Sequence, residues 1–212
     1  MLQGLCIAAA LSAVLAIMAD WNETKPRIFY VLKPLTTILI AGIALQAADT
    51  PYRDWIVAGL LLSMIGDICL MFHGNAAFIG GLSSFLLAHL VFMWAFVHDQ
   101  PLAGVPVWAA AYVVYGIAFS VVLLPRAGNL KLPVLLYGAV LMAMAITASI
   151  RSVQVDDASG GFALIGASLF VLSDSALGAR KFIGPYRGAQ GLILSTYWAA
   201  IGLIAGSALY VS

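Results

Sequence analysis

The chain alternates between long apolar stretches and short polar breaks. Most apolar stretches run for close to 20 residues, which is about the length an α-helix needs to cross the hydrocarbon core of a bilayer. The breaks carry turn residues, as in Asp49-Thr50-Pro51 and His73-Gly74-Asn75. This pattern predicts an all-α, polytopic membrane helix bundle with about eight transmembrane helices. The predicted helices cover residues 2–19, 30–47, 55–72, 80–97, 105–124, 132–150, 161–179 and 188–211.

The composition agrees with a chain that has almost no soluble part. Of its 212 residues, 63% are hydrophobic and 9% are charged, whereas soluble domains carry roughly 25% charged residues. No break is long enough to separate domains, so residues 1–212 are expected to form a single transmembrane domain. The stretch 2–19 lacks a basic start and is interpreted as a retained helix rather than a signal peptide. The net charge of +1 argues against a nucleic-acid partner, so membrane lipids are the expected partners.

The basic residues are distributed unequally between the two sets of loops. Eight of the ten lie in breaks that follow odd-numbered helices, and only Arg53 and Arg151 follow even-numbered ones. Because basic loops are retained in the cytoplasm, this asymmetry predicts that the more basic side is cytoplasmic and that both termini lie on the other side. The eight residues are Lys25, Arg27, Lys33, Arg126, Lys131, Arg180, Lys181 and Arg187.

The two halves of the chain resemble each other weakly. Leu32-Lys33-Pro34 opens the second predicted helix, and Leu130-Lys131-Leu132-Pro133 precedes the sixth. Gly66-Asp67-x-x-Leu70 in the third helix has a counterpart in Ser173-Asp174-x-x-Leu177 in the seventh. Four helices per half would form two parallel repeats related by an axis along the membrane normal. Short echoes also arise by chance in chains rich in leucine and alanine.

Asp67 and Asp174 are the residues most indicative of function. Each lies inside an otherwise apolar helix, where an ionisable group is costly and marks a functional site by default. Each also lies about 7 Å of helical rise from the end of its helix on the basic side, so the two carboxyl groups are expected at one level of the membrane. The structural alternative is that a lysine or Ser173 pairs with each aspartate only to stabilise packing.

Further polar residues are expected near the two aspartates. Lys33 begins its helix on the same side and is suited to hold a phosphate, to pair with an aspartate, or to reach the interface as a snorkelling side chain. His89 and Tyr197 lie at comparable distances after Asp67 and Asp174 along the chain. His89 is alternatively a hydrogen-bonded core residue. The predicted substrate-binding residues are Lys33, His89, Ser173, Lys181 and Tyr197.

Other kinds of site fit the sequence poorly. A catalytic zinc site needs three protein ligands, yet His73 and His98 are predicted at opposite membrane faces, so one histidine at most joins the aspartates. The chain lacks a G-x-S-x-G nucleophile elbow and a Walker loop. We therefore expect a site without a metal or an organic cofactor.

The polar motifs together resemble the YhhN-like lysoplasmalogenase family over nearly the whole chain. The resemblance rests on Leu32-Lys33-Pro34, Gly66-Asp67-x-x-Leu70, Ala88-His89-Leu90, Ser173-Asp174-x-x-Leu177 and Thr196-Tyr197-Trp198, in this order along the helices. It implies hydrolysis of the vinyl-ether bond of lysoplasmalogens, which releases a fatty aldehyde and a glycerophospho-alcohol. It also implies that the family's two acidic positions fall on Asp67 and Asp174.

The implied reaction suits a pair of buried carboxyl groups. Cleavage of a vinyl ether begins with protonation of an alkene carbon and gives an oxocarbenium ion, the kind of cation that glycosidases handle with paired carboxylates. Two carboxyl groups in a low-dielectric pocket do not both ionise cheaply, so one is available as an acid. The apolar neighbours of Asp67 favour it as this acid, whereas the donors and cations near Asp174 favour an ionised carboxylate there.

Two other classes of protein share some of these features. Buried aspartates, a histidine and an internal repeat also describe a small proton-coupled transporter that uses Asp67, Asp174 and His89. Against a transporter, the chain is short and none of its helices is interrupted centrally by Gly-Pro pairs. A structural membrane protein would not need two aspartates at matched depth.

Overall fold

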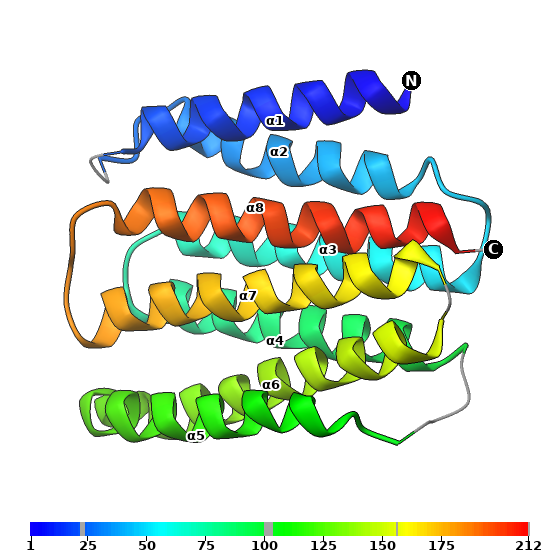
Figure 1. Ribbon diagram of the computed structural model, residues 1–212. Helices are drawn as coiled ribbons and strands as arrows, with labels where there is room; N and C mark the ends of the chain where they lie inside the picture. The colour runs from blue at the N-terminus through cyan, green and yellow to red at the C-terminus, as the bar shows by residue number, and fades with distance from the viewer. Residues whose placement is uncertain (22–23, 100–103, 156, 212) are drawn as a thin grey trace.

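Within the part of the chain that the structure describes, the apolar stretches form eight α-helices that pack side by side in an up-and-down bundle (Figure 1). The computed structural model describes residues 1–21, 24–99, 104–155 and 157–211, and these contain no β-strand. Single turns of 3₁₀-helix extend several ends, for example Val107–Ala109 before α5 and Ala208–Tyr210 after α8. The helices are α1 Leu2–Ala19, α2 Phe29–Ala44, α3 Pro51–Met71, α4 Asn75–Val97, α5 Ala110–Leu123, α6 Lys131–Gln154, α7 Ala158–Phe182 and α8 Ala189–Ser207.

The architecture predicted from the sequence is confirmed as a polytopic helix bundle. Seven of the described helices are long and apolar enough to cross a membrane. The eighth, α2, has 16 residues, or about 24 Å of helical rise. It is short because its last residue is Ala44 rather than the predicted residue 47. The predicted turn residues 22–23, 100–101 and 156 lie outside the described residues.

Local capping explains where several helices begin. Thr50 accepts a hydrogen bond from the backbone N–H of Arg53 at 3.2 Å, and Pro51 occupies the first turn of α3. Asp157 accepts one from the backbone N–H of Ser159 at 2.8 Å and so caps α7. These caps begin both aspartate-bearing helices on the side of the bundle away from Asp67 and Asp174.

Burial differs strongly among the helices. Of the membrane-spanning helices, α8 is the most buried and α5 the least. In Figure 1, α8 runs between α2 and α7, whereas α5 lies at one edge beside α6. Large apolar side chains such as Ile7 on α1 and Val121 on α5 remain exposed. In a bilayer these side chains would face lipid, as the composition requires.

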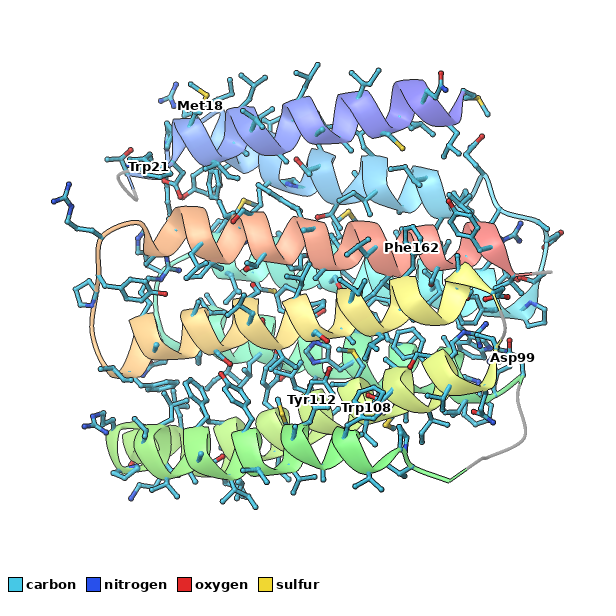
Figure 2. The ribbon with its side chains drawn as sticks, viewed as in Figure 1. Met18, Trp21, Asp99, Trp108, Tyr112 and Phe162 are labelled. Atoms are coloured by element: carbon cyan, nitrogen blue, oxygen red, sulfur yellow. The ribbon has the colours of Figure 1, made fainter. Side chains whose placement is uncertain are left out.

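A buried arginine joins four helices at one end of the bundle. Arg151 on α6 pairs with Asp99 at 2.9 Å, and its Nε and Nη2 atoms each lie 3.3 Å from the hydroxyl of Ser159 on α7. Its guanidinium lies 3.9 Å from the ring centroid of Tyr52 on α3. The Tyr52 hydroxyl is 2.7 Å from that of Ser207 on α8. Figure 2 shows Asp99 at this end of the molecule and Trp21 at the opposite end.

Candidate active site

A cavity of about 430 Å³ opens at the end of the bundle where α1, α3 and α7 end and α8 begins. This is the left end in Figure 1. Asp67 and Asp174 both line this cavity, which confirms that the two aspartates share one pocket. Polar and charged side chains also line it, among them Asp20, Lys25, Lys33, Ser173, Arg180, Lys181, Gln190 and Tyr197.

Asp67 is held by three donors from two other helices. Lys33 Nζ lies 3.1 Å from Asp67 Oδ1 and forms a buried ion pair with it. Thr37 Oγ1 donates to Asp67 Oδ2 at 2.8 Å, and the Tyr197 hydroxyl donates to the same oxygen at 2.7 Å. Only 2% of the aspartate side chain is exposed. A carboxylate with a cation and two hydroxyl donors is stabilised in its ionised form.

The spacing of residues along α2 explains this arrangement. Lys33 and Thr37 are four positions apart, so both project from one face of α2 toward α3. Lys33 also donates to the backbone carbonyl of Asp67 at 3.3 Å, which anchors α2 to α3 at this level. The sequence left open whether Lys33 pairs with an aspartate, and the structure shows that it does.

Asp174 has different surroundings. The Tyr137 hydroxyl on α6 donates to Asp174 Oδ2, and His89 Nε2 lies 3.9 Å from the same oxygen, beyond hydrogen-bond distance. Within the described ranges, Asp174 has no lysine or arginine at ion-pair distance. About 10% of its side chain is exposed. The two carboxyl groups therefore differ in both charge environment and access.

His89 does not line the cavity, which contradicts the sequence prediction. It is fully buried, and neither ring nitrogen has a hydrogen-bond partner among the described residues. The ring packs edge-on against Phe170 at 4.6 Å and Tyr137 at 5.2 Å between centroids. Phe85, one turn earlier on α4, takes the lining position instead, and His89 lies behind the residues that line the cavity.

Aromatic rings connect the surroundings of the two aspartates. Phe170 contacts His89, next to Asp174, and also Tyr197, the donor to Asp67, at 5.6 Å between centroids. Phe85 packs on both Phe170 and Tyr197. Tyr197 donates to Asp67 and Tyr137 donates to Asp174, so the same aromatic cluster would resist a movement of either donor.

The two halves make matching contacts around their aspartates. Asp67 on α3 accepts hydrogen bonds from α2 and α8, whereas Asp174 on α7 accepts one from α6 and is approached by α4. Each aspartate thus meets the second helix of its own half and the last helix of the other half. This matching set of contacts agrees with the two parallel repeats that the sequence echoes suggest.

A polar network surrounds the mouth of the cavity. The side chain of Gln190 donates to Asp20 Oδ2 at 2.6 Å and accepts from Arg180. The backbone N–H of Lys25 donates to Asp20 Oδ1 at 2.6 Å, and its ammonium donates to the Met71 carbonyl at 2.9 Å. Lys181 is exposed and lies over the Phe78 ring, 4.7 Å from its centroid. The mouth is therefore rich in cations.

Four of the five predicted substrate-binding residues line the cavity: Lys33, Ser173, Lys181 and Tyr197. Sequence reasoning missed Thr37 and Tyr137, which bond the two aspartates, and the buried Asp20 at the mouth. The four-residue spacing from Lys33 is a signal that would have found Thr37. The described residues hold no group of three or more histidine, cysteine or acidic side chains placed to bind a metal.

Fold and site together define a class of protein: a polytopic membrane protein with two unlike carboxyl groups in one cavity that opens near a membrane face. The chain belongs to the YhhN family, whose family profile matches residues 28–208. It is similar to the human protein named lysoplasmalogenase TMEM86B, with 34% identity over 179 residues, covering 84% of this chain and 74% of the relative.

Bacterial relatives carry the same activity name. The Mycobacterium bovis protein named lysoplasmalogenase is 32% identical over 174 residues, which cover 79% of this chain and 64% of that protein. Human lysoplasmalogenase TMEM86A is 29% identical over 181 residues, covering 81% of this chain and 72% of the relative. No solved structure matches the chain. The family named from the sequence motifs is confirmed.

Proposed function

We propose that this protein is a membrane-embedded hydrolase that cleaves the vinyl-ether bond of lysoplasmalogen-type lipids and releases a fatty aldehyde and a glycerophospho-alcohol. The observation that carries the proposal is one cavity lined by two carboxyl groups with different partners. The activity named for several relatives supports the same reaction.

The first chemical step assigns a role to Asp174. Its carboxyl group has no lysine or arginine partner within the described part of the chain, so a buried site favours its neutral form. In this form it donates its proton to the alkene carbon that is not bonded to oxygen. The C=C electron pair forms the new C–H bond, and an oxocarbenium ion remains. Asp174 becomes a carboxylate close to that cation.

Asp67 completes the reaction as the ionised member of the pair. Its carboxylate accepts a proton from water while the water oxygen bonds to the oxocarbenium carbon, which gives a hemiacetal. Asp67, now neutral, protonates the leaving glycerol oxygen as the C–O bond breaks, and Asp174 takes the hemiacetal hydroxyl proton. One water is consumed, one aldehyde and one alcohol form, and both aspartates return to their starting states.

These roles are the reverse of the assignment favoured by the sequence. The apolar neighbours of Asp67 along α3 suggested an acid. In the structure, however, Lys33 and two hydroxyl groups approach its carboxyl group from α2 and α8. Arg180 was expected to keep Asp174 ionised, but it donates to Gln190. Contacts from other helices therefore affect the charge state of each aspartate more than its neighbours in the sequence do.

The cations at the mouth suit the phosphate of a lysophospholipid headgroup. Lys181→Ala should raise KM for a lysoplasmalogen up to about fivefold and leave kcat little changed, because an exposed charge pair contributes about 1 kcal/mol or less. Arg187→Ala is the matched control, since Arg187 is an exposed cation in the loop after α7 but does not line the cavity. Equal KM values for both variants would exclude Lys181 from headgroup binding.

The experiment that tests the proposed reaction is aldehyde release by the purified protein. Lysoplasmalogen and an ordinary acyl lysophospholipid with the same headgroup should be compared in detergent micelles. We expect aldehyde from the vinyl ether and no hydrolysis of the ester. Ester hydrolysis without aldehyde release would replace the proposal with a lysophospholipase activity, and no hydrolysis of either would favour the transporter alternative.

Metal removal should not affect the reaction as proposed, because each proton transfer uses a carboxyl group. Aldehyde release by protein treated with a strong chelator and dialysed should match that of untreated protein. Loss of activity that divalent cations restore would contradict the carboxylate mechanism. The sequence expectation of a site without cofactor is tested by the same measurement.

We further propose that the cavity mouth faces the cytoplasm, since most basic residues lie on that side. Two variants would report the orientation: Lys181→Cys and Asp49→Cys. Each is made in a protein whose Cys6 and Cys69 are replaced by alanine. A membrane-impermeant thiol reagent added to intact cells should label position 49 and spare position 181. The opposite labelling would reverse the orientation.

A further inference from the structure

A second, apolar pocket lies next to the proposed catalytic cavity. It has a volume of about 80 Å³ and is lined from α3, α4, α5, α6 and α7. Asp174 lines both this pocket and the polar cavity, whereas Asp67 lines only the polar one. Three glycines line it, one on each of three helices: Gly116 on α5, Gly138 on α6 and Gly178 on α7.

Next to this pocket lies a groove of about 790 Å³ between α5 and α6. Gly116, Ser120, Gly138 and Met142 line both spaces. Along α6 the groove extends from Lys131 to Ile146, a separation of 15 positions or about 22 Å of helical rise. Its lining is almost entirely apolar, and among the described residues that line it only Lys131 is charged. The groove is long and mostly apolar, and it runs from Lys131 at the basic end of the bundle toward the opposite end.

The position of α5 gives the groove access to lipid. This helix is the least buried of the membrane-spanning helices and packs mainly against α6. In Figure 1 it lies at the edge of the bundle beside α6, and it also contacts α7. A hydrocarbon chain in the surrounding bilayer would therefore meet the groove without crossing a polar surface.

We propose that the apolar pocket and the groove between α5 and α6 bind the hydrocarbon chain of the lipid substrate. The inference rests on the proposed function and adds where each part of the lipid lies. The headgroup occupies the polar cavity, the chain follows α5 and α6, and the bond that joins them lies at Asp174, where the two spaces meet. Asp174 is then the carboxyl group nearest to the alkene carbon, as the proposed acid must be.

Two residues at the junction control how much chain is accommodated. A Cβ atom on Gly138 would meet no other atom within 4 Å, so a larger side chain there is tolerated by the helix and projects into open space. Met142 packs closely on α5 where the two spaces meet, since a Cβ atom on Gly116 would lie only 2.8 Å from Met142 Cγ. Gly138→Leu should therefore obstruct the passage, and Met142→Ala should widen it.

The first test measures kcat/KM for lysoplasmalogens that differ only in chain length. Gly138→Leu should lower the ratio of long-chain to short-chain kcat/KM about tenfold, which corresponds to about two methylene groups left unburied. Met142→Ala should raise the same ratio. Gly202→Leu on α8 and Met93→Ala on α4 are matched controls, because neither residue lines these spaces and a Cβ atom on Gly202 also meets nothing within 4 Å. An unchanged ratio in both junction variants would overturn the chain site.

The second test needs no turnover. A lysophospholipid with a photoreactive diazirine at the end of its chain is irradiated with the wild-type protein, and the modified peptides are identified. Cross-links within residues 113–146 support the chain site. If they form but the protein releases no aldehyde, the chain site stands and only the proposed reaction fails. Cross-links confined to α1, α2 or α8 overturn the chain site, while aldehyde release would leave the proposed reaction intact.

Discussion

Asparagine at either Asp67 or Asp174 should abolish aldehyde release from lysoplasmalogen while the protein remains folded in detergent. Asparagine keeps the shape of the side chain and much of its hydrogen bonding, but it neither delivers a proton nor carries the negative charge. The loss in kcat should be at least the 10²- to 10⁴-fold typical of a general acid or base. The measurement is the rate of aldehyde release under saturating substrate.

The two losses should not add, because the aspartates act as one unit in each turnover. The double variant should be about as slow as the slower single variant. A bell-shaped pH profile of the wild type, with limbs that belong to the pair rather than to one residue, should accompany this result. Additive losses would indicate that the two carboxyl groups contribute to the rate independently rather than as one unit.

Controls separate loss of chemistry from loss of fold. Asp49→Asn is the matched surface control, since Asp49 is 89% exposed and precedes α3, whereas Asp67 lies near the other end of that helix. Asp67→Asn leaves Lys33 buried without its carboxylate, so Asp67→Asn combined with Lys33→Met tests whether any unfolding comes from that unpaired charge. Substantial aldehyde release by either folded single variant would overturn the mechanism of paired aspartates.

The sequence predicted the features of the fold that depend on length and polarity. Runs of about 20 apolar residues fixed the helices because a bilayer leaves few other structures possible. Asp67 and Asp174 were identifiable because an ionisable residue within such a run is rare without a function. The end of α2 was misplaced by three residues, since Leu45 and Ala47 are apolar and give no signal of a turn.

Rotation of each helix about its axis was much harder to predict. A helix that is apolar on every side carries no periodic signal of which face meets its neighbours. His89 was therefore expected in the cavity, although its ring lies behind Phe170 and Tyr137. The partners of Asp174 were missed for the same reason, because Tyr137 lies 37 positions away and reaches it only through the packing of α6 on α7.

The largest expected effect on stability lies at the opposite end of the bundle. Asp99→Asn should lower the thermal stability strongly, because it leaves the Arg151 guanidinium buried without a carboxylate partner. Arg151 is 1% exposed, and its partner Asp99 is 25% exposed. Breaking a buried ion pair from one side costs about 3–5 kcal/mol, and the partial exposure of Asp99 places the expected loss toward the lower end of that range. The unfolding temperature in detergent measures the effect.

A double variant identifies the cause of this loss. Arg151→Met combined with Asp99→Asn removes the unpaired charge while Met keeps apolar contact with the Tyr52 ring. We expect this double variant to be more stable than Asp99→Asn alone, which is the non-additivity that a coupled pair produces. Tyr52 precedes Asp67 on α3 by 15 positions, or about 22 Å, so residual folded protein should keep the wild-type KM. A double variant less stable than Asp99→Asn would show instead that the bonds from Arg151 to Ser159 and its contact with Tyr52 stabilise this end of the bundle more than the charge pair does.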